Sequence, residues 1–204
     1  IGDPKGTSTI YHRAHGIYLD EFSANIEVSQ NTIAHSGICG IKLHKAHDNI
    51  FKNNITFNNW EGIGLYNSLS TSTIYNNDIF SNIFFAKTTS QYSIRIQTST
   101  NDIIKFGKAD LNYYVRPIDD DDVVSTYQPS TGNKNRTLEN WQSFTGQDLN
   151  SHKSPIAITD VNTILFEYNA TKTDKTVTLS KPMIDVTGKK YTGSVTLAPY
   201  TSVI

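Results

Sequence analysis

The first half of the chain repeats one short pattern of apolar and polar positions. Three segments share this pattern. Each begins with a glycine, which is followed by an isoleucine, a variable residue and a leucine: 16–20 (GIYLD), 40–44 (GIKLH) and 62–66 (GIGLY). The glycines are 24 and 22 positions apart. Alternation with a period of two is typical of β-strands, so each copy predicts a short strand.

Two further columns repeat with nearly the same period. Isoleucines recur at intervals of 24: Ile26, Ile50 and Ile74. Asparagines recur at intervals of 23: Asn31, Asn54 and Asn77. Self-similarity at such a period indicates a solenoid, either a leucine-rich repeat or a parallel β-helix.

The spacing of the apolar residues decides between the two solenoids. Leucine-rich repeats need a Leu-x-x-Leu-x-Leu ladder and usually a helical return, whereas the segments between these strands are rich in turn residues. The pattern therefore predicts a right-handed parallel β-helix of about four turns, with strands stacked roughly 4.8 Å apart. The three asparagines are expected to form one ladder at a turn, with a structural role.

The second half of the chain has a different pattern. The repeat ends near Val115, and Thr137 is a good N-cap for a short helix reaching about Phe144. Four strand-like segments follow: 164–169, 175–179, 183–186 and 194–197. We predict an all-β chain with three parts, namely β-helix turns in 1–115, a connector with a short helix in 116–154, and an antiparallel module in 155–204. The module could be a cap, a packing partner or a sugar-binding module, and capping is the preferred role.

Composition removes several function classes. The 204 residues carry 18 Lys and Arg against 19 Asp and Glu, so no basic field exists for general nucleic-acid binding. No apolar run approaches the roughly 20 residues of a membrane span. The single cysteine, Cys39, excludes an intrachain disulfide and a Cys-rich zinc site, and is expected to be a small buried residue.

Alternation also predicts which side chains face outward. The outward positions carry the chemistry: Tyr18, Asp20, Lys42, His44, Gly64, Tyr66 and, on a looser fourth turn, Arg95. Gly64 would leave room beside Tyr66, whose ring could stack on a sugar. His12, Arg13 and His15 come just before the first strand. A carboxylate close to histidine and lysine is a plausible acid–base group, so Asp20, His44 and Lys42 are the catalytic candidates.

The other outward residues are candidates for substrate binding: Tyr18, His15, Glu61, Tyr66 and Arg95. A structural alternative is an exposed Asp20–Lys42 ion pair of little energetic value. Glycoside hydrolysis needs two carboxyl groups roughly 5 to 9.5 Å apart, and the pattern supplies one clear outward carboxylate. A lyase would instead use Lys42, His44 and Arg95 as base and as cations for a uronate. Both reactions stay open.

Metal signals are weaker. The run 119–122 has four aspartates but lacks the spaced ligands of a Ca²⁺ loop, so a solvated acidic turn is the preferred interpretation and Ca²⁺ the alternative. His44 and His47 are three apart on a strand and turn, where they need not converge. We therefore expect no metal site and no cofactor.

Several stretches together resemble a known group of proteins. Residues 16–21 (GIYLDE), 82–85 (NIFF) and 112–114 (NYY) resemble the pectate-lyase-like β-helix proteins of bacterial polysaccharide degradation. Residues 138–142 (LENWQ) are similar to the connector of those proteins, and 193–202 (GSVTLAPYTS) to the last strand of an appended β-sandwich. The resemblance covers nearly the whole chain, but this fold serves hydrolases, lyases and adhesins alike.

The resemblance implies a secreted or periplasmic bacterial protein that acts on a polysaccharide or oligosaccharide. A glycoside hydrolase with its groove on the β-helix face is the leading hypothesis. A polysaccharide lyase and a non-catalytic polysaccharide-binding or adhesin-type β-helix are the alternatives. Because residues 1–10 show no amphipathic capping helix, we also expect further N-terminal turns of the same protein to adjoin this chain.

Overall fold

The repeats of the first half fold into a coil of stacked strands. The structure is a computed structural model that describes residues 14–68 and 74–204. One face is a six-stranded sheet, and its parallel strands are β1 (Ile17–Leu19), β4 (Cys39–His44), β7 (Glu61–Asn67), β10 (Tyr92–Thr98) and β13 (Val124–Gln128). Strand β14 (Gly132–Arg136) adds to β13 in the antiparallel sense. We call this sheet the front sheet.

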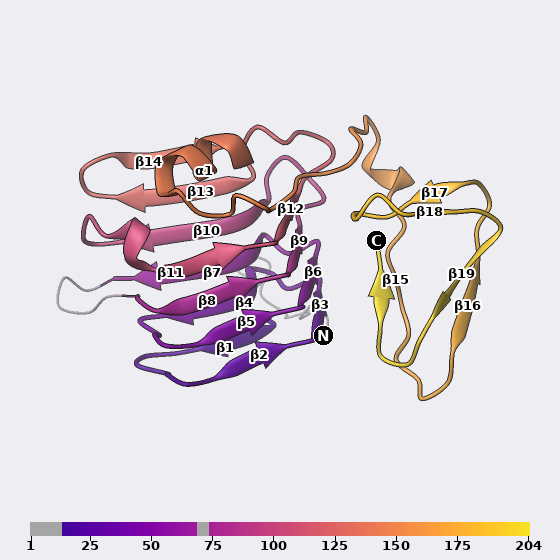
Figure 1. The fold of residues 1–204 in the computed structure, drawn as a ribbon, viewed down its shortest axis with the longest axis horizontal. Coiled ribbons are helices and arrows are strands. Elements are labelled where there is room, and N and C mark those ends of the chain that lie inside the picture. The colour runs from indigo at the N-terminus through magenta and orange to yellow at the C-terminus, as the bar shows by residue number, and fades with distance from the viewer. Residues whose placement is uncertain (1–13, 69–73) are drawn as a thin grey trace, which may run out of the picture.

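Two four-stranded parallel sheets complete each turn of the coil (Figure 1). The second sheet contains β2 (Glu27–Ser29), β5 (Ile50–Lys52), β8 (Asn77–Phe80) and β11 (Gly107–Asp110). The third contains β3 (Thr32–Ala34), β6 (Ile55–Phe57), β9 (Ile83–Phe85) and β12 (Tyr113–Val115). The predicted fold class, an all-β parallel β-helix of about four turns followed by a small antiparallel module, is confirmed.

Apolar residues at equal positions of each turn fill the inside of the coil. Ile17 pairs with Ile41, Ile41 with Ile63, Ile63 with Ile94, and Ile94 with Val124. All but Ile17 are fully buried. The predicted alternation of the front strands is therefore confirmed, because a shift of one residue would turn every one of these side chains outward.

Asparagines form a ladder at one corner of the coil, but its members differ from the predicted ones. The side-chain amide of Asn31 donates to Asn54 Oδ1 at 3.0 Å, Asn54 to Asn82 at 2.9 Å, and Asn82 to Asn112 at 3.1 Å. Asn77 belongs to a second corner, where Asn49 donates to it at 3.2 Å. The expectation that Asn77 continues the ladder of Asn31 and Asn54 was wrong.

The reason is that the turns differ in length. The paired positions Ile17, Ile41 and Ile63 are 24 and 22 residues apart, but Ile94 and Val124 follow after 31 and 30. A fixed period therefore selects the wrong asparagine on the third turn. The isoleucine column fails for the same reason, since Glu27, rather than Ile26, pairs with Ile50, and both isoleucines are exposed.

Each ladder asparagine follows a residue with left-handed backbone conformation. These preceding residues have φ between 56° and 60°: Gln30, Asn53, Ser81 and Leu111. A non-glycine residue in this conformation costs roughly 1–2 kcal/mol. The ladder compensates for this cost, because the side chains of Asn54, Asn82 and Asn112 each accept a backbone N–H of the preceding turn.

A helix closes the C-terminal end of the coil. Helix α1 (Leu138–Thr145) begins as predicted, with Thr137 Oγ1 accepting the Asn140 N–H, and ends at left-handed Gly146. Trp141 is fully buried and its indole donates to Asp148 at 2.8 Å. Asp148 also accepts the amide of Asn112, so it terminates the ladder.

The coil continues past the boundary expected at residue 115. Strand β13 still pairs in parallel with β10. A short 3₁₀ helix, η1 (Ile103–Lys105), lies between β10 and β11. The acidic run separates β12 from β13 within one turn of the coil, which explains why the sequence pattern appears to stop there.

The C-terminal module contains three antiparallel pairs of short strands and begins with a second 3₁₀ turn, η2 (Val161–Thr163). The pairs are β15 (Glu167–Tyr168) with β20 (Ser202–Val203), β16 (Lys175–Thr178) with β19 (Ser194–Leu197), and β17 (Met183–Ile184) with β18 (Lys190–Tyr191). The module lies against the third sheet, where Phe166 stacks on Phe57 at 4.3 Å between centroids (Figure 1). The module therefore covers a flank of the coil, while α1 closes the end that the module was expected to cap.

The ladder predicts a large effect from one amide. Asn54→Ala removes the acceptor of the Asn31 N–H and the donor to Val28 O, so the free energy of unfolding should fall by about 3 kcal/mol. Chemical denaturation measures it. The control Asn135→Ala, at an exposed position of β14, should change it by less than about 0.5 kcal/mol. Equal effects of the two substitutions would contradict a stabilising role of the ladder.

Candidate functional site

The outer face of the front sheet carries the residues that the sequence singled out. Register places Tyr18 beside Lys42, Lys42 beside Gly64, and Gly64 beside Arg95. A second row continues from His44 to Tyr66, Gln97 and Tyr127. Side chains far apart in sequence thus lie in two parallel rows across successive turns.

Asp20 and His44 form a hydrogen bond at one end of these rows. Asp20 Oδ1 lies 2.9 Å from His44 Nδ1 and accepts the Tyr18 hydroxyl at 2.8 Å. These bonds lower the pKa of Asp20 to about 2, with the His44 bond as the largest cause and the Glu21 backbone and Tyr18 bonds next. Asp20 is therefore ionised at neutral pH, and its partner is His44 instead of the Lys42 considered above.

The other ring nitrogen of His44 contacts a residue that the sequence analysis missed. His44 Nε2 lies 3.2 Å from Ser68 Oγ. Strand pairing places Tyr66 beside His44, and Ser68 lies two residues beyond Tyr66, so no column of the repeat contains Ser68. The serine comes directly after β7, outside the copied GIGLY segment.

Lys42 lies between two aromatic rings. Its Nζ is 4.8 Å from the centroid of the Tyr18 ring and 5.3 Å from that of Tyr66. Cation–π contacts of this kind are worth about 0.5–1 kcal/mol at exposed sites. They hold the ammonium group over the sheet surface.

Glu61 is fully buried beneath the face, which corrects the expectation that it contacts substrate directly. The Tyr66 hydroxyl donates to its carboxylate at 2.5 Å, the Cys39 thiol at 3.0 Å, and Arg95 Nη1 at 3.4 Å. Burial and the Glu61 charge raise the pKa of both Tyr66 and Cys39, so both stay protonated. Glu61 therefore positions Tyr66 and Arg95 from below.

Gly64 makes room for this buried cluster. A Cβ atom at Gly64 would lie 2.6 Å from Glu61 Oε2 and 2.8 Å from Cys39 Sγ. Real Cβ contacts are essentially never that short, so a larger residue here would displace the carboxylate. Gly64 thus leaves space beside Tyr66, as predicted, but the Glu61 side chain occupies that space.

His15 lies at the start of this face. Its ring packs at 5.3 Å against Tyr18, and its Nδ1 accepts the Cys39 N–H at 3.3 Å. Burial, and then the charge of Lys42, lower the pKa of His15 to about 4. His15 is therefore neutral at pH 7. His12 and Arg13 lie outside the described residues.

A cleft of about 470 Å³ opens on this face. Its lining combines cations, aromatic rings and neutral polar groups, and among the described residues it includes no carboxylate: Lys42, His44, Tyr66, Asn67, Ser68, Arg95, Gln97, Thr98, Ser99, Tyr127 and Asn133. The cleft is therefore positively charged, with rings and amides that suit a sugar. Arg95 Nε is buried there and has no hydrogen-bond acceptor.

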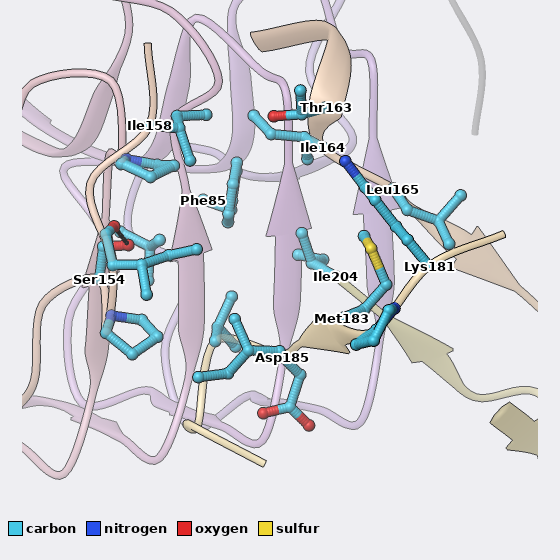
Figure 2. A pocket seen from close by; sticks show the side chains of 17 residues that line it. Phe85, Ser154, Ile158, Thr163, Ile164, Leu165, Lys181, Met183, Asp185 and Ile204 are labelled. Atoms are coloured by element: carbon cyan, nitrogen blue, oxygen red, sulfur yellow. Dashed lines mark hydrogen bonds between the residues drawn. The ribbon is translucent and has the colours of Figure 1, made fainter. Parts of the chain in front are cut away.

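A second cavity, of about 200 Å³, lies between the coil and the C-terminal module. Figure 2 shows Phe85 of the coil facing Ile164, Met183 and Ile204, with the Lys181 amine at the rim beside Ile164. The Asp185 carboxylate accepts from Thr187 and Tyr191, so it is already satisfied. This cavity is an apolar gap at the packing interface.

Metal ligands do not gather in the described parts of the chain. Across residues 14–68 and 74–204, no group of three or more His, Cys, Asp and Glu side chains is arranged to hold a metal ion. In the acidic run, Asp119 pairs with Arg116 and Asp120 with Lys153. Ca²⁺ binding there stays an untested alternative.

The fold and this face define a parallel β-helix protein with an open, charged sheet surface. A family model described as "Periplasmic copper-binding protein (NosD)" matches residues 5–114, and the chain belongs to this family. No curated protein and no solved structure matches. The family is periplasmic by its description, in agreement with the predicted secreted or periplasmic location. Among the described residues, no helix is long and apolar enough to cross a membrane.

The lowered pKa of His15 predicts how stability depends on pH. Between about pH 6.5 and 4 the unfolded chain binds a proton at His15 that the folded protein does not bind, so His15 makes stability fall as the pH falls. In His15→Gln this contribution disappears, and the urea midpoint should fall less steeply than in the wild type over that window. Identical slopes for the two proteins would contradict the assignment.

Proposed function

We propose that the protein binds an acidic polysaccharide along the outer face of the front sheet. The observation that carries this proposal is the charge of the cleft. Lys42 and Arg95 line it, while the neighbouring carboxylate of Glu61 is buried beneath them. A uronate-containing or otherwise anionic glycan supplies the complementary charge.

The geometry of the face also suits a polymer. Outward side chains repeat from turn to turn at the spacing of stacked strands, so an extended chain can contact several turns at once. Tyr66 and Tyr127 line the cleft and offer ring faces for sugars, while Gln97 and Asn133 offer amides for hydroxyl groups. Arg95 is held over Trp60 at 5.6 Å and anchored by Glu61, so its position is fixed before binding.

Glycoside hydrolysis has less support than binding. Asp20, with a pKa of about 2, is a poor general acid, and Glu61 lies beneath Tyr66. The described lining of the cleft includes no carboxylate, and Asp20 lies outside that lining. Lyase activity has more support than hydrolase activity, because His44, Lys42 and Arg95 line the same cleft. Hydrolase and lyase activity both stay predictions.

Copper binding, which the family description names, does not fit the described residues. Copper is bound by imidazole, thiolate and thioether ligands in close groups. In the described ranges His44 is engaged by Asp20 and Ser68, while the Cys39 thiol is buried, protonated and bonded to Glu61. The proposal therefore includes no copper.

Binding depends on the two cations of the cleft. In affinity electrophoresis, we expect polygalacturonate in the gel to slow the migration of the 204-residue protein. The retardation should decrease as the salt concentration rises. Lys42→Gln and Arg95→Gln should each weaken the interaction about tenfold, roughly 1.4 kcal/mol. Lys108→Gln, an exposed lysine of the second sheet, is the matched control and should behave as the wild type.

The same samples distinguish the catalytic alternatives. New reducing ends without ultraviolet absorbance would indicate a hydrolase, and an absorbing unsaturated product would indicate a lyase. Equal retardation of the wild type and both cleft variants, or preference for a neutral glucan, would overturn the proposal that this cleft binds acidic glycans.

A further inference from the structure

Three residues from successive turns form a hydrogen-bonded chain at the edge of the cleft. Asp20 Oδ1 is 2.9 Å from His44 Nδ1, and His44 Nε2 is 3.2 Å from Ser68 Oγ. We propose that Ser68 is the nucleophile of an ester hydrolase, with His44 as its general base and Asp20 as the positioning residue.

The bonding partners determine which nitrogen of His44 carries the proton. An ionised carboxylate only accepts hydrogen bonds, so Nδ1 must be the donor to Asp20. In the neutral imidazole, Nε2 is then unprotonated and accepts the Ser68 hydroxyl proton. This is the arrangement that activates a serine in acyl transfer, and it is recognised by geometry instead of by chain order.

The coil itself creates this alignment. Asp20 directly follows β1, His44 is the last residue of β4, and Ser68 directly follows β7. Leu19 pairs with Leu43, so Asp20 lies beside His44. His44 pairs with Tyr66, and Ser68, two residues beyond Tyr66, is reached by the His44 ring at 3.2 Å. Tyr18 donates a second bond to the same Asp20 oxygen and supports its orientation.

The cleft adjoins the reacting residues. Ser68 and His44 line it together with the cations Lys42 and Arg95, whose charge attracts an anionic glycan to the serine. The class of substrate, an O-acyl ester such as an acetyl group on an acidic glycan, rests on the proposed function.

Each step balances with water as the second reactant. Ser68 Oγ bonds to the ester carbonyl carbon while His44 Nε2 takes its proton. The bond from that carbon to the sugar oxygen then breaks, His44 returns the proton to this oxygen, and a free sugar hydroxyl leaves. Water attacks the acyl-serine, His44 takes and returns its proton, and the acid and Ser68 are released.

Labelling tests the nucleophile directly. A fluorophosphonate probe should modify the 204-residue protein at Ser68, as located by peptide mass spectrometry, and inactivate it. The protein should release acetate from acetylated polygalacturonate and 4-nitrophenol from 4-nitrophenyl acetate. Ser68→Ala should lose the label, and hydrolysis should fall by roughly 10³-fold or more.

Matched variants separate catalysis from structure. Ser29→Ala, which removes a hydroxyl bonded to Glu27 on the second sheet, should keep labelling and rate. Asp20→Asn should lower kcat by at least about a hundredfold with KM nearly unchanged, since it disturbs the tautomer of His44 and not substrate contact. A purely structural Asp20 would leave kcat unchanged.

The outcomes distinguish this inference from the proposed function. Retained binding of deacetylated polygalacturonate with no labelling of Ser68 and no ester hydrolysis would overturn the inference and leave the binding proposal intact. Labelling and 4-nitrophenyl acetate hydrolysis without any glycan binding would support the nucleophile and overturn its assignment to glycan esters.

Discussion

The stacking of buried asparagine amides is the interaction on which the rest of the structure depends. Parallel strands of three or four residues form few backbone hydrogen bonds, and the corners between them bring polar backbone groups into the interior. Asn31, Asn54, Asn82 and Asn112 satisfy those groups from one turn to the next, and Asp148 accepts the last amide. Burial raises the pKa of Asp148, and the hydrogen bonds that it accepts from Ser151, Trp141, Asn112 and Tyr114 act in the opposite direction.

The same register that buries the isoleucines brings the polar face together. Strand pairing brings Asp20 beside His44, and the His44 ring reaches Ser68 on the next turn, while Glu61 is covered by Tyr66 from its own strand. The cleft gains its positive character because its carboxylates are either bonded at the edge or buried below. Its chemistry is thus determined by which charges remain accessible to solvent.

Much of the fold, and part of the face, could be predicted from the sequence. Alternation in the three GI-x-L segments places Tyr18, Lys42 and His44 outward without reference to the other turns. Asn77 was misassigned because residues added between Asn54 and Asn82 change the period, and only strand pairing reveals the new one. The burial of Glu61 follows from its contacts with Cys39 and Arg95, which no local pattern encodes.

The left-handed corners have a consequence for how such a coil changes over time. Gln30, Ser81 and Leu111 share one backbone conformation but no side-chain chemistry, so the fold constrains the geometry of the corner while leaving its amino-acid type free. Mutations there alter stability through the cost of the left-handed conformation and leave the contacts of the coil in place. Lineages can therefore drift apart at these positions while every strand stays stacked, and overall sequence identity then understates how closely two such coils agree in shape.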